Sequence, residues 1–217
     1  MNSNRNSDQQ QLFESLSFSG EITASVTHEL NNVLGTIEQV TGLIEDMAAT
    51  DVAQKAGISD KLLDIVNRVI RQSDRGTALI KRLNAFAHLA DNAVVECDLG
   101  ELLENIVGLS ERIARMNKVQ LVTTGLDQKI IVKANPFMIV RTIYSAIKRA
   151  IQIADPSESI QINSDQDQEE AVITIDVRCG DSIDDSTEMT VASQGVRIEE
   201  TTVDGRCSIK LVISSSR

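Results

Sequence analysis

The stretch "SVTHELNNVLGTIEQV", from Ser25 to Val40, carries one of the two histidines of the chain. Apolar residues recur every three or four positions in and around it, at Ile22, Val26, Leu30, Val33, Ile37, Val40, Ile44 and Met47. This spacing predicts an amphipathic helix with one buried face. His28 lies about 200° around the helix from both Val26 and Leu30. Its ring is therefore predicted to point away from the buried face, into solvent.

The composition of the 217-residue chain limits its function. A formal net charge of −11 argues against nucleic acid, whose phosphates need a basic surface. No apolar run approaches the roughly 18–20 residues of a membrane span, and the polar N-terminus lacks a signal-peptide pattern. Cys97, Cys179 and Cys207 form neither a zinc motif nor a disulfide framework, which fits a reducing compartment. We expect a cytoplasmic protein that binds no nucleic acid, membrane or metal.

Two long amphipathic segments are predicted in the first half of the chain. The first ends near Ala48, and the second runs from about Asp60 to Ala90. The apolar stripe of the second is predicted at Leu62, Val66, Val69, Ser73, Ile80, Leu83, Ala87 and Ala90. A lone hairpin cannot bury both stripes, whereas two copies can form a four-helix bundle that does. Residues 12–92 are therefore expected to be an antiparallel helical hairpin that forms a homodimer.

Helical and strand patterns alternate from residue 93 onward. Helices are predicted over Leu99–Met116 and from Asn135, because asparagine followed by proline suits a helix N-terminus. Strands are predicted over residues 119–124, 129–134, 159–164, 170–178, 196–202 and 207–214. An Asp-Gly pair at 204–205 indicates a hairpin turn, and an irregular stretch is expected over 181–193. Residues 93–217 are predicted to be an α/β sandwich, which makes the whole chain α+β.

Five segments carry a family resemblance: "THELNNVLGTI", "DRGTALIKRLNAFAHLA", "CDLGELLENIV", "VKANPFMIVRTIYSAIKRAIQ" and "GVRIEETTVDGRCSIKLVI". The first two resemble the phosphoacceptor box and the second helix of the dimerization and phosphotransfer domain of bacterial sensor histidine kinases. The other three resemble parts of the ATPase domain of that family. The resemblance covers nearly the whole chain after residue 12, with Val33 where the family often has a proline. It implies a helical hairpin followed by an ATPase-like sandwich.

The nucleotide-binding positions implied by the resemblance are altered. Arg149 stands where the family has a magnesium-binding asparagine, and arginine offers N–H donors but no acceptor. Arg178 replaces an adenine-binding aspartate, and Ser182 replaces a glycine. Between Gly180 and Gly195 there is no room for the family's glycine-rich lid, and the acidic residues there would repel phosphates. We therefore expect that ATP and Mg²⁺ binding is lost and that the protein uses no cofactor.

The resemblance places the phosphoryl acceptor at His28. An exposed imidazole with a neutral nitrogen near pH 7 can take a phosphoryl group from a phospho-aspartate. In the family, the glutamate at the position of Glu29 orients or deprotonates the ring. An amide with the spacing of Asn32 can orient a water that hydrolyses the partner's phospho-aspartate. Ordinary surface polarity is the alternative interpretation of Glu29 and Asn32.

One face of the second helix carries Arg68, Arg71, Arg75 and Arg82. These cations could dock the acidic phosphorylation pocket of a receiver domain. Alternatively, they form a solvated face paired with acids of the first helix such as Glu38 and Glu45.

The sequence favours a dimeric histidine phosphotransfer protein of a two-component phosphorelay. Phosphoryl groups would pass between His28 and receiver-domain aspartates of a response regulator, without ATP. This makes the protein a phosphotransferase rather than an ATP-dependent kinase. Two alternatives stay open, a divergent ATP-dependent histidine kinase and a non-catalytic module that binds a receiver or a kinase.

Overall fold

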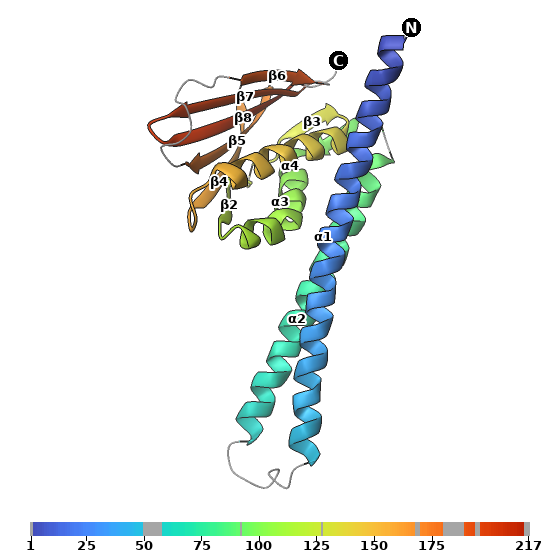
Figure 1. Ribbon diagram of the computed structural model, residues 1–217, viewed down its shortest axis with the longest axis vertical. Helices are drawn as coiled ribbons and strands as arrows, with labels where there is room; N and C mark the ends of the chain where they lie inside the picture. The colour runs from blue at the N-terminus through green and yellow to red at the C-terminus, as the bar shows by residue number, and fades with distance from the viewer. Residues whose placement is uncertain are drawn as a thin grey trace.

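Two long antiparallel helices form the elongated part of the molecule (Figure 1). They are α1 (Asn2–Ala49) and α2 (Ile58–Ala87), and the short 3₁₀ helix η2 (His88–Ala90) follows the second. The predicted hairpin is confirmed, with its first helix beginning at Asn2. The computed structural model describes residues 2–49, 58–91, 93–126, 128–167, 170–179, 189–193 and 196–214. Within these ranges, no helix has both the length and the apolar character needed to cross a membrane.

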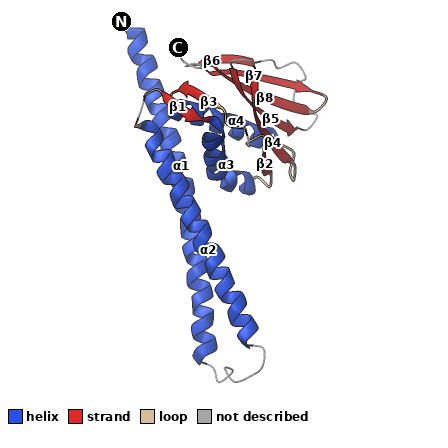
Figure 2. Ribbon diagram, turned by 180° about the vertical axis from the view of Figure 1, so that it is seen from behind, coloured by secondary structure: helices blue, strands red, loops and turns tan. Residues whose placement is uncertain are grey.

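An α/β sandwich lies beside the upper part of the hairpin (Figure 2). Its described elements are β1 (Val95–Asp98), α3 (Leu99–Met116), β2 (Gln120–Thr124), β3 (Ile131–Ala134), α4 (Pro136–Ile153), β4 (Ser159–Asp167), β5 (Glu170–Arg178), β6 (Met189–Ser193), β7 (Val196–Val203) and β8 (Arg206–Ser214). The large sheet has the order β2-β4-β5-β8-β7-β6, with β2 and β4 parallel and the other neighbours antiparallel. Strands β1 and β3 form a separate pair. The predicted sandwich, with α3 and α4 packed on the sheet, is confirmed.

The sequence predicted the turn at residues 204–205 correctly and the segment 181–193 only in part. The Asp-Gly turn between β7 and β8 is confirmed, since Asp204 and Gly205 both have positive φ, at 49° and 70°. The prediction of an irregular stretch over 181–193 is wrong in its last part, because β6 (Met189–Ser193) pairs antiparallel with β7. A strand at the edge of a sheet is held by backbone bonds to one neighbour, so it needs no strong apolar alternation of its own.

An aromatic cluster joins the hairpin to the sandwich. Phe18 of α1 lies at the centre, with ring centroids 5.3 Å from Phe86 of α2, 5.6 Å from Phe137 and 5.1 Å from Tyr144 of α4. These are four of the five aromatic residues of the chain, which has four Phe, one Tyr and no Trp. The apolar core continues from this cluster into the sandwich without a break. The hairpin and the sandwich therefore share one core.

The buried stripe of α2 differs from the predicted one. Ile65, Leu79 and Phe86 are buried, whereas Val66 and Ile80 of the predicted stripe are 44% and 58% exposed. The predicted set combined positions from two adjacent faces of the helix, of which one packs on α1 and the other faces solvent. Gly76 lies close against α1, because a Cβ there would lie 3.2 Å from Cγ1 of Val33.

Replacing Phe18 by Ala should destabilise the protein strongly. The ring is 6% exposed and touches three other rings, so its loss leaves a cavity in the shared core. We expect the free energy of unfolding, measured with urea, to fall by about 3–5 kcal/mol. Phe13→Ala is the matched control, since Phe13 is on the same helix but 72% exposed, and it should change this free energy by less than about 0.5 kcal/mol. Equal effects of the two substitutions would contradict the packing described here.

Candidate functional site

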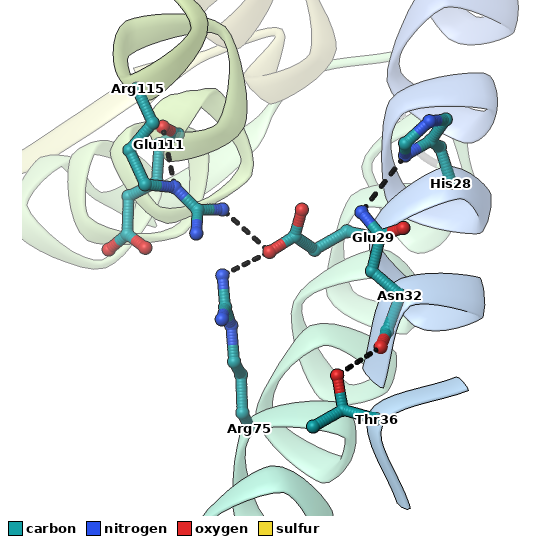
Figure 3. A network of polar contacts seen from close by, with 7 residues as sticks. All are labelled: His28, Glu29, Asn32, Thr36, Arg75, Glu111 and Arg115. Atoms are coloured by element: carbon teal, nitrogen blue, oxygen red, sulfur yellow. Dashed lines mark hydrogen bonds and ion pairs between the residues drawn. The ribbon is translucent and has the colours of Figure 1, made fainter. Parts of the chain in front are cut away.

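His28 lies on the solvent side of α1, as its position in the apolar pattern predicted. Its ring nitrogen Nδ1 is 3.2 Å from Nδ2 of Asn32, one helical turn further along (Figure 3). The helix itself sets this contact, because residues four apart on a helix are neighbours. The structure therefore brings together His28 and Asn32, two of the three predicted site residues.

The amide of Asn32 can control which ring nitrogen is nucleophilic. An amide offers an N–H donor in one orientation and a carbonyl acceptor after a 180° rotation. In the structure Nδ2 faces Nδ1, so the amide donates to Nδ1 and the neutral ring carries its proton on Nε2. After a 180° rotation of the amide, Oδ1 accepts the Nδ1–H and the free electron pair is on Nε2. Nε2 is then the nucleophile of an exposed imidazole.

The side chain of Glu29 points away from His28 (Figure 3). It is 6% exposed, and its Oε1 atom accepts hydrogen bonds from Arg75 of α2 and, at 2.6 Å, from Nη2 of Arg115 of α3. Glu29 therefore ties three helices together. Within the described part of the chain, its hydrogen bonds go to these arginines and not to the ring of His28.

The environment of Glu29 keeps its carboxylate ionised. Burial alone would raise the pKa of Glu29, but the hydrogen bond and charge of Arg115, with the charges of Arg75 and Arg112, lower the pKa below its ordinary value of 4.5. A general base works best when its pKa is near the operating pH. To assist His28 as the sequence predicted, the Glu29 carboxylate would first have to leave the two arginines.

An open hollow of about 410 Å³ lies beside the histidine. Its lining is His28, Glu29, Asn32, Arg112, Arg115 and Met116. The sandwich contributes the last three residues, all from the end of α3. The candidate site is therefore built from both halves of the chain.

The sequence did not predict that three arginines belong to this site. Arg75 was noted only as part of a basic face of the second helix, and its actual partner is Glu29 rather than Glu38 or Glu45. Arg112 and Arg115 stand three residues apart on one side of α3, a spacing that is visible in the sequence. Their position beside His28 depends on how the sandwich docks on α1, which local patterns do not contain.

Solved structures with a similar fold include histidine kinases and parts of histidine kinases. The nucleotide-free catalytic domain of histidine kinase ThkA aligns with 58% of this chain and 100% of its own, at 14% identity and a TM-score of 0.50. The sandwich therefore has the fold of a histidine kinase catalytic domain. Histidine kinase AdeS of Acinetobacter baumannii covers 88% of this chain and 98% of its own at 13% identity, with a TM-score of 0.46. ThkA in complex with the response regulator TrrA covers 100% of this chain and 67% of its own at 15% identity, with a TM-score of 0.45.

Sequence comparisons add nothing to this similarity of fold. No protein-family model matches the sequence. No curated protein matches it either.

The helix that resembles the nucleotide-binding segment of the histidine kinase family makes internal ion pairs here. Arg149 of α4 donates from Nε and Nη2 to Oε1 of Glu200 on β7, at 3.2 and 3.1 Å. Glu200 is 4% exposed, so this pair forms part of the sandwich. Arg178 is exposed at the end of β5, 4.0 Å from Glu158. The predicted differences at 180–188, including Ser182, lie outside the described residues.

Side chains also connect α1 with α4. Lys148 donates to Glu21 at 2.7 Å, and Arg141 donates to Ser15 at 3.2 Å. Tyr144 lies between these contacts, and its burial and the nearby charge of Glu21 raise its pKa. No group of three or more His, Cys, Asp and Glu side chains in the described ranges could hold a metal ion.

Replacing Glu29 by Gln should remove a pH-dependent contribution to stability. Because the pKa of Glu29 is below 4.5 in the folded protein, the unfolded chain binds this proton at a higher pH than the folded protein. Stability therefore rises with pH between the folded and unfolded pKa values. The contribution is complete above the unfolded pKa and is lost as the pH falls through the folded pKa.

Urea unfolding of the wild type and Glu29→Gln between about pH 7 and pH 3 checks this sign. The stability difference should be largest near neutral pH and should shrink below about pH 4.5. Glu38→Gln removes one exposed carboxylate from the same helix and corrects for the change in net charge. A Glu29→Gln difference that stays constant over the whole range would contradict the ion-paired state.

Proposed function

We propose that the protein is a dimeric histidine phosphotransfer protein that relays phosphoryl groups between His28 and receiver-domain aspartates of a response regulator. The observation that carries this proposal is the exposed ring of His28. The side-chain amide of Asn32 contacts its Nδ1, and Arg112 and Arg115 line the hollow beside it. A cytoplasmic protein of a two-component system fits this chemistry. Glu29 completes the proposed set of site residues.

The transfer step needs only the groups described and the acyl phosphate of the partner. After the Asn32 amide rotates so that Oδ1 rather than Nδ2 faces Nδ1–H, Nε2 of His28 attacks the phosphorus of the phospho-aspartate. The Nε2–P bond forms while the P–O bond to the aspartate breaks, and the electron pair of the broken bond remains on the aspartate carboxylate. The imidazole keeps its Nδ1 proton, so the phosphorylated ring is cationic until that proton leaves.

The internal ion pair of α4 supports transfer without ATP. Mg²⁺ binds oxygen ligands, and the guanidinium of Arg149 supplies none. Moving Arg149 aside for a nucleotide would leave the buried carboxylate of Glu200 without its cation, which is costly. We therefore propose that neither ATP nor Mg²⁺ is a cofactor of this protein.

A solvent-facing stripe of α2 supports the proposed homodimer. Leu63, Val66, Ile70 and Ile80 are 44–61% exposed, and their spacings of three, four and ten residues place them on one side of the helix. Leu34 of α1 is also 56% exposed. Large exposed aliphatic side chains in a row are typical of an interface. We propose that α1 and α2 of two copies form a four-helix bundle.

Light scattering at micromolar concentration should give the mass of a dimer. Ile70→Asp should give a monomer of unchanged helix content, because a carboxylate in the bundle would be buried without a partner. Arg71→Asp, also exposed on α2 but about 100° around the helix from Ile70, should remain dimeric. A wild-type monomer, or a dimeric Ile70→Asp, would show that this stripe does not mediate association.

Incubation with a ³²P-labelled receiver domain should transfer label to the protein, and His28→Ala should abolish the transfer. The matched control is His88→Ala, which removes the only other histidine of the sequence. His88 belongs to the short helix after α2, and its Nδ1 lies 2.7 Å from Oδ2 of Asp91. Labelled ATP with Mg²⁺ should leave the wild type unlabelled. Label from ATP would instead support a divergent kinase, and retention of label by His28→Ala would leave the binding module as the better interpretation.

Two further variants separate the roles of the neighbouring residues. Asn32→Ala should slow labelling by roughly 10-fold to 100-fold, because the ring loses the group that fixes its orientation. Glu29→Ala should slow it by about 10²–10⁴ if the carboxylate assists the ring directly. Unchanged labelling in Glu29→Ala would limit this residue to holding Arg75 and Arg115.

A further inference from the structure

We propose that Arg112 and Arg115 of α3 form a phosphoryl-binding site that completes the His28 site from the sandwich side. The inference rests on the proposed function, since it assigns the residues that bind the transferred group. It makes the sandwich a direct participant in binding the phosphoryl group, although the histidine belongs to the hairpin.

The charges around the hollow favour a bound anion. The Glu29 carboxylate carries one negative charge and accepts hydrogen bonds from two guanidinium groups, Arg75 and Arg115. Arg112 adds a third positive charge close enough to lower the pKa of Glu29. Glu29 and Glu111 are the carboxylates beside these three cations, so one positive charge remains in excess. In a chain with a net charge of −11, this is a local excess of positive charge.

Both arginines have N–H groups that no acceptor in the described ranges uses. Arg115 uses Nη2 for Glu29 and Nε for the backbone carbonyl of Glu111, at 3.4 Å, so in the described ranges Nη1 has no protein acceptor. Arg112 has no hydrogen bond to an acceptor in the same ranges, and it lines the hollow together with His28. A guanidinium binds phosphate through paired N–H groups with a fixed geometry.

The position of Arg115 links phosphate binding to Glu29. Arg115 is 51% exposed at its side chain, whereas the Glu29 side chain is 8% exposed. The arginine can therefore turn toward a phosphoryl group on Nε2 without crossing the core. The Glu29 carboxylate would keep Arg75 as its partner during this change, so the buried charge stays paired.

The direct test is a titration of the protein with inorganic phosphate, followed by the NMR signals of its two imidazole rings. His28→Ala assigns the signals, and His88 is an internal reference because it lies at the far end of α2 from the hairpin connection. In the wild type, the His28 signals should move with phosphate while those of His88 stay. In Arg112→Gln and Arg115→Gln, the dissociation constant should rise about tenfold or more, and the double variant should show no saturable shift.

Charge-preserving and remote variants distinguish binding from a structural role. Arg112→Lys and Arg115→Lys keep the charge and should restore part of the affinity. Arg141→Gln removes an arginine that also bridges the sandwich and α1, at Ser15, and should bind phosphate as the wild type does. Equal His28 shifts in the wild type and the double variant, or no shift in the wild type, would overturn the proposal.

A chemical phosphoryl donor gives a second readout that needs no receiver domain. Phosphoramidate can phosphorylate Nε2 of His28, as the P–N bond to the departing ammonia breaks and the Nε2–P bond forms. The half-saturating donor concentration should rise about tenfold or more in the double variant and recover in the lysine variants. An unchanged half-saturating concentration would count against the arginines. Failure of a receiver to label a protein that still shows these effects would reject the phosphorelay and keep the phosphoryl-binding site.

Discussion

The carboxylate of Glu29 is the point at which three helices of this protein meet. It is almost fully buried on α1 and is bound by one arginine from α2 and one from α3. A buried carboxylate left without any cation is costly, so Glu29 has to keep at least one of these two arginines. The contact therefore fixes both the packing of the hairpin and the place where the sandwich docks on it. The hollow beside His28 exists because this docking brings the end of α3 to the histidine.

The sandwich has the fold of a histidine kinase catalytic domain, and charged side chains of its helix α4 make contacts within the protein. Arg149 pairs with buried Glu200, and the neighbouring Lys148 and Arg141 contact α1. A surface that resembles a nucleotide-binding segment thus serves to hold the sandwich together and against the hairpin. A fold alone does not determine function, which depends on the side chains that its elements position at a site.

The sequence predicted the elements better than the contacts between them. The hairpin, most helices and strands along the chain, and the solvent-facing side of His28 followed from periodicity, which depends on local geometry alone. The apolar stripe of α2 was placed wrongly because this helix has apolar residues on two adjacent faces, and only the position of α1 decides which of them is buried. β6 was missed because an edge strand depends on its neighbour rather than on its own pattern.

Within the site, the sequence predicted only the contact between residues that are close along the chain. His28 and Asn32 are one turn apart, so a helical segment was enough to place them together. The partners of Glu29 lie 46 and 86 residues away along the chain, and no local pattern indicates such pairs. The resemblance suggested that Glu29 serves the ring, whereas the tertiary structure turns its carboxylate toward Arg75 and Arg115.

The aromatic cluster between the hairpin and the sandwich gives the protein a built-in optical reporter. Tyr144 is the only tyrosine, the chain has no tryptophan, and the ring lies 5.1 Å from Phe18 of the hairpin. Intrinsic fluorescence excited near the tyrosine band therefore comes from a single side chain at the junction of the two parts. Any movement of the sandwich away from α1 exposes this ring to water and changes its emission. The docking that builds the His28 hollow can thus be followed in solution without a label.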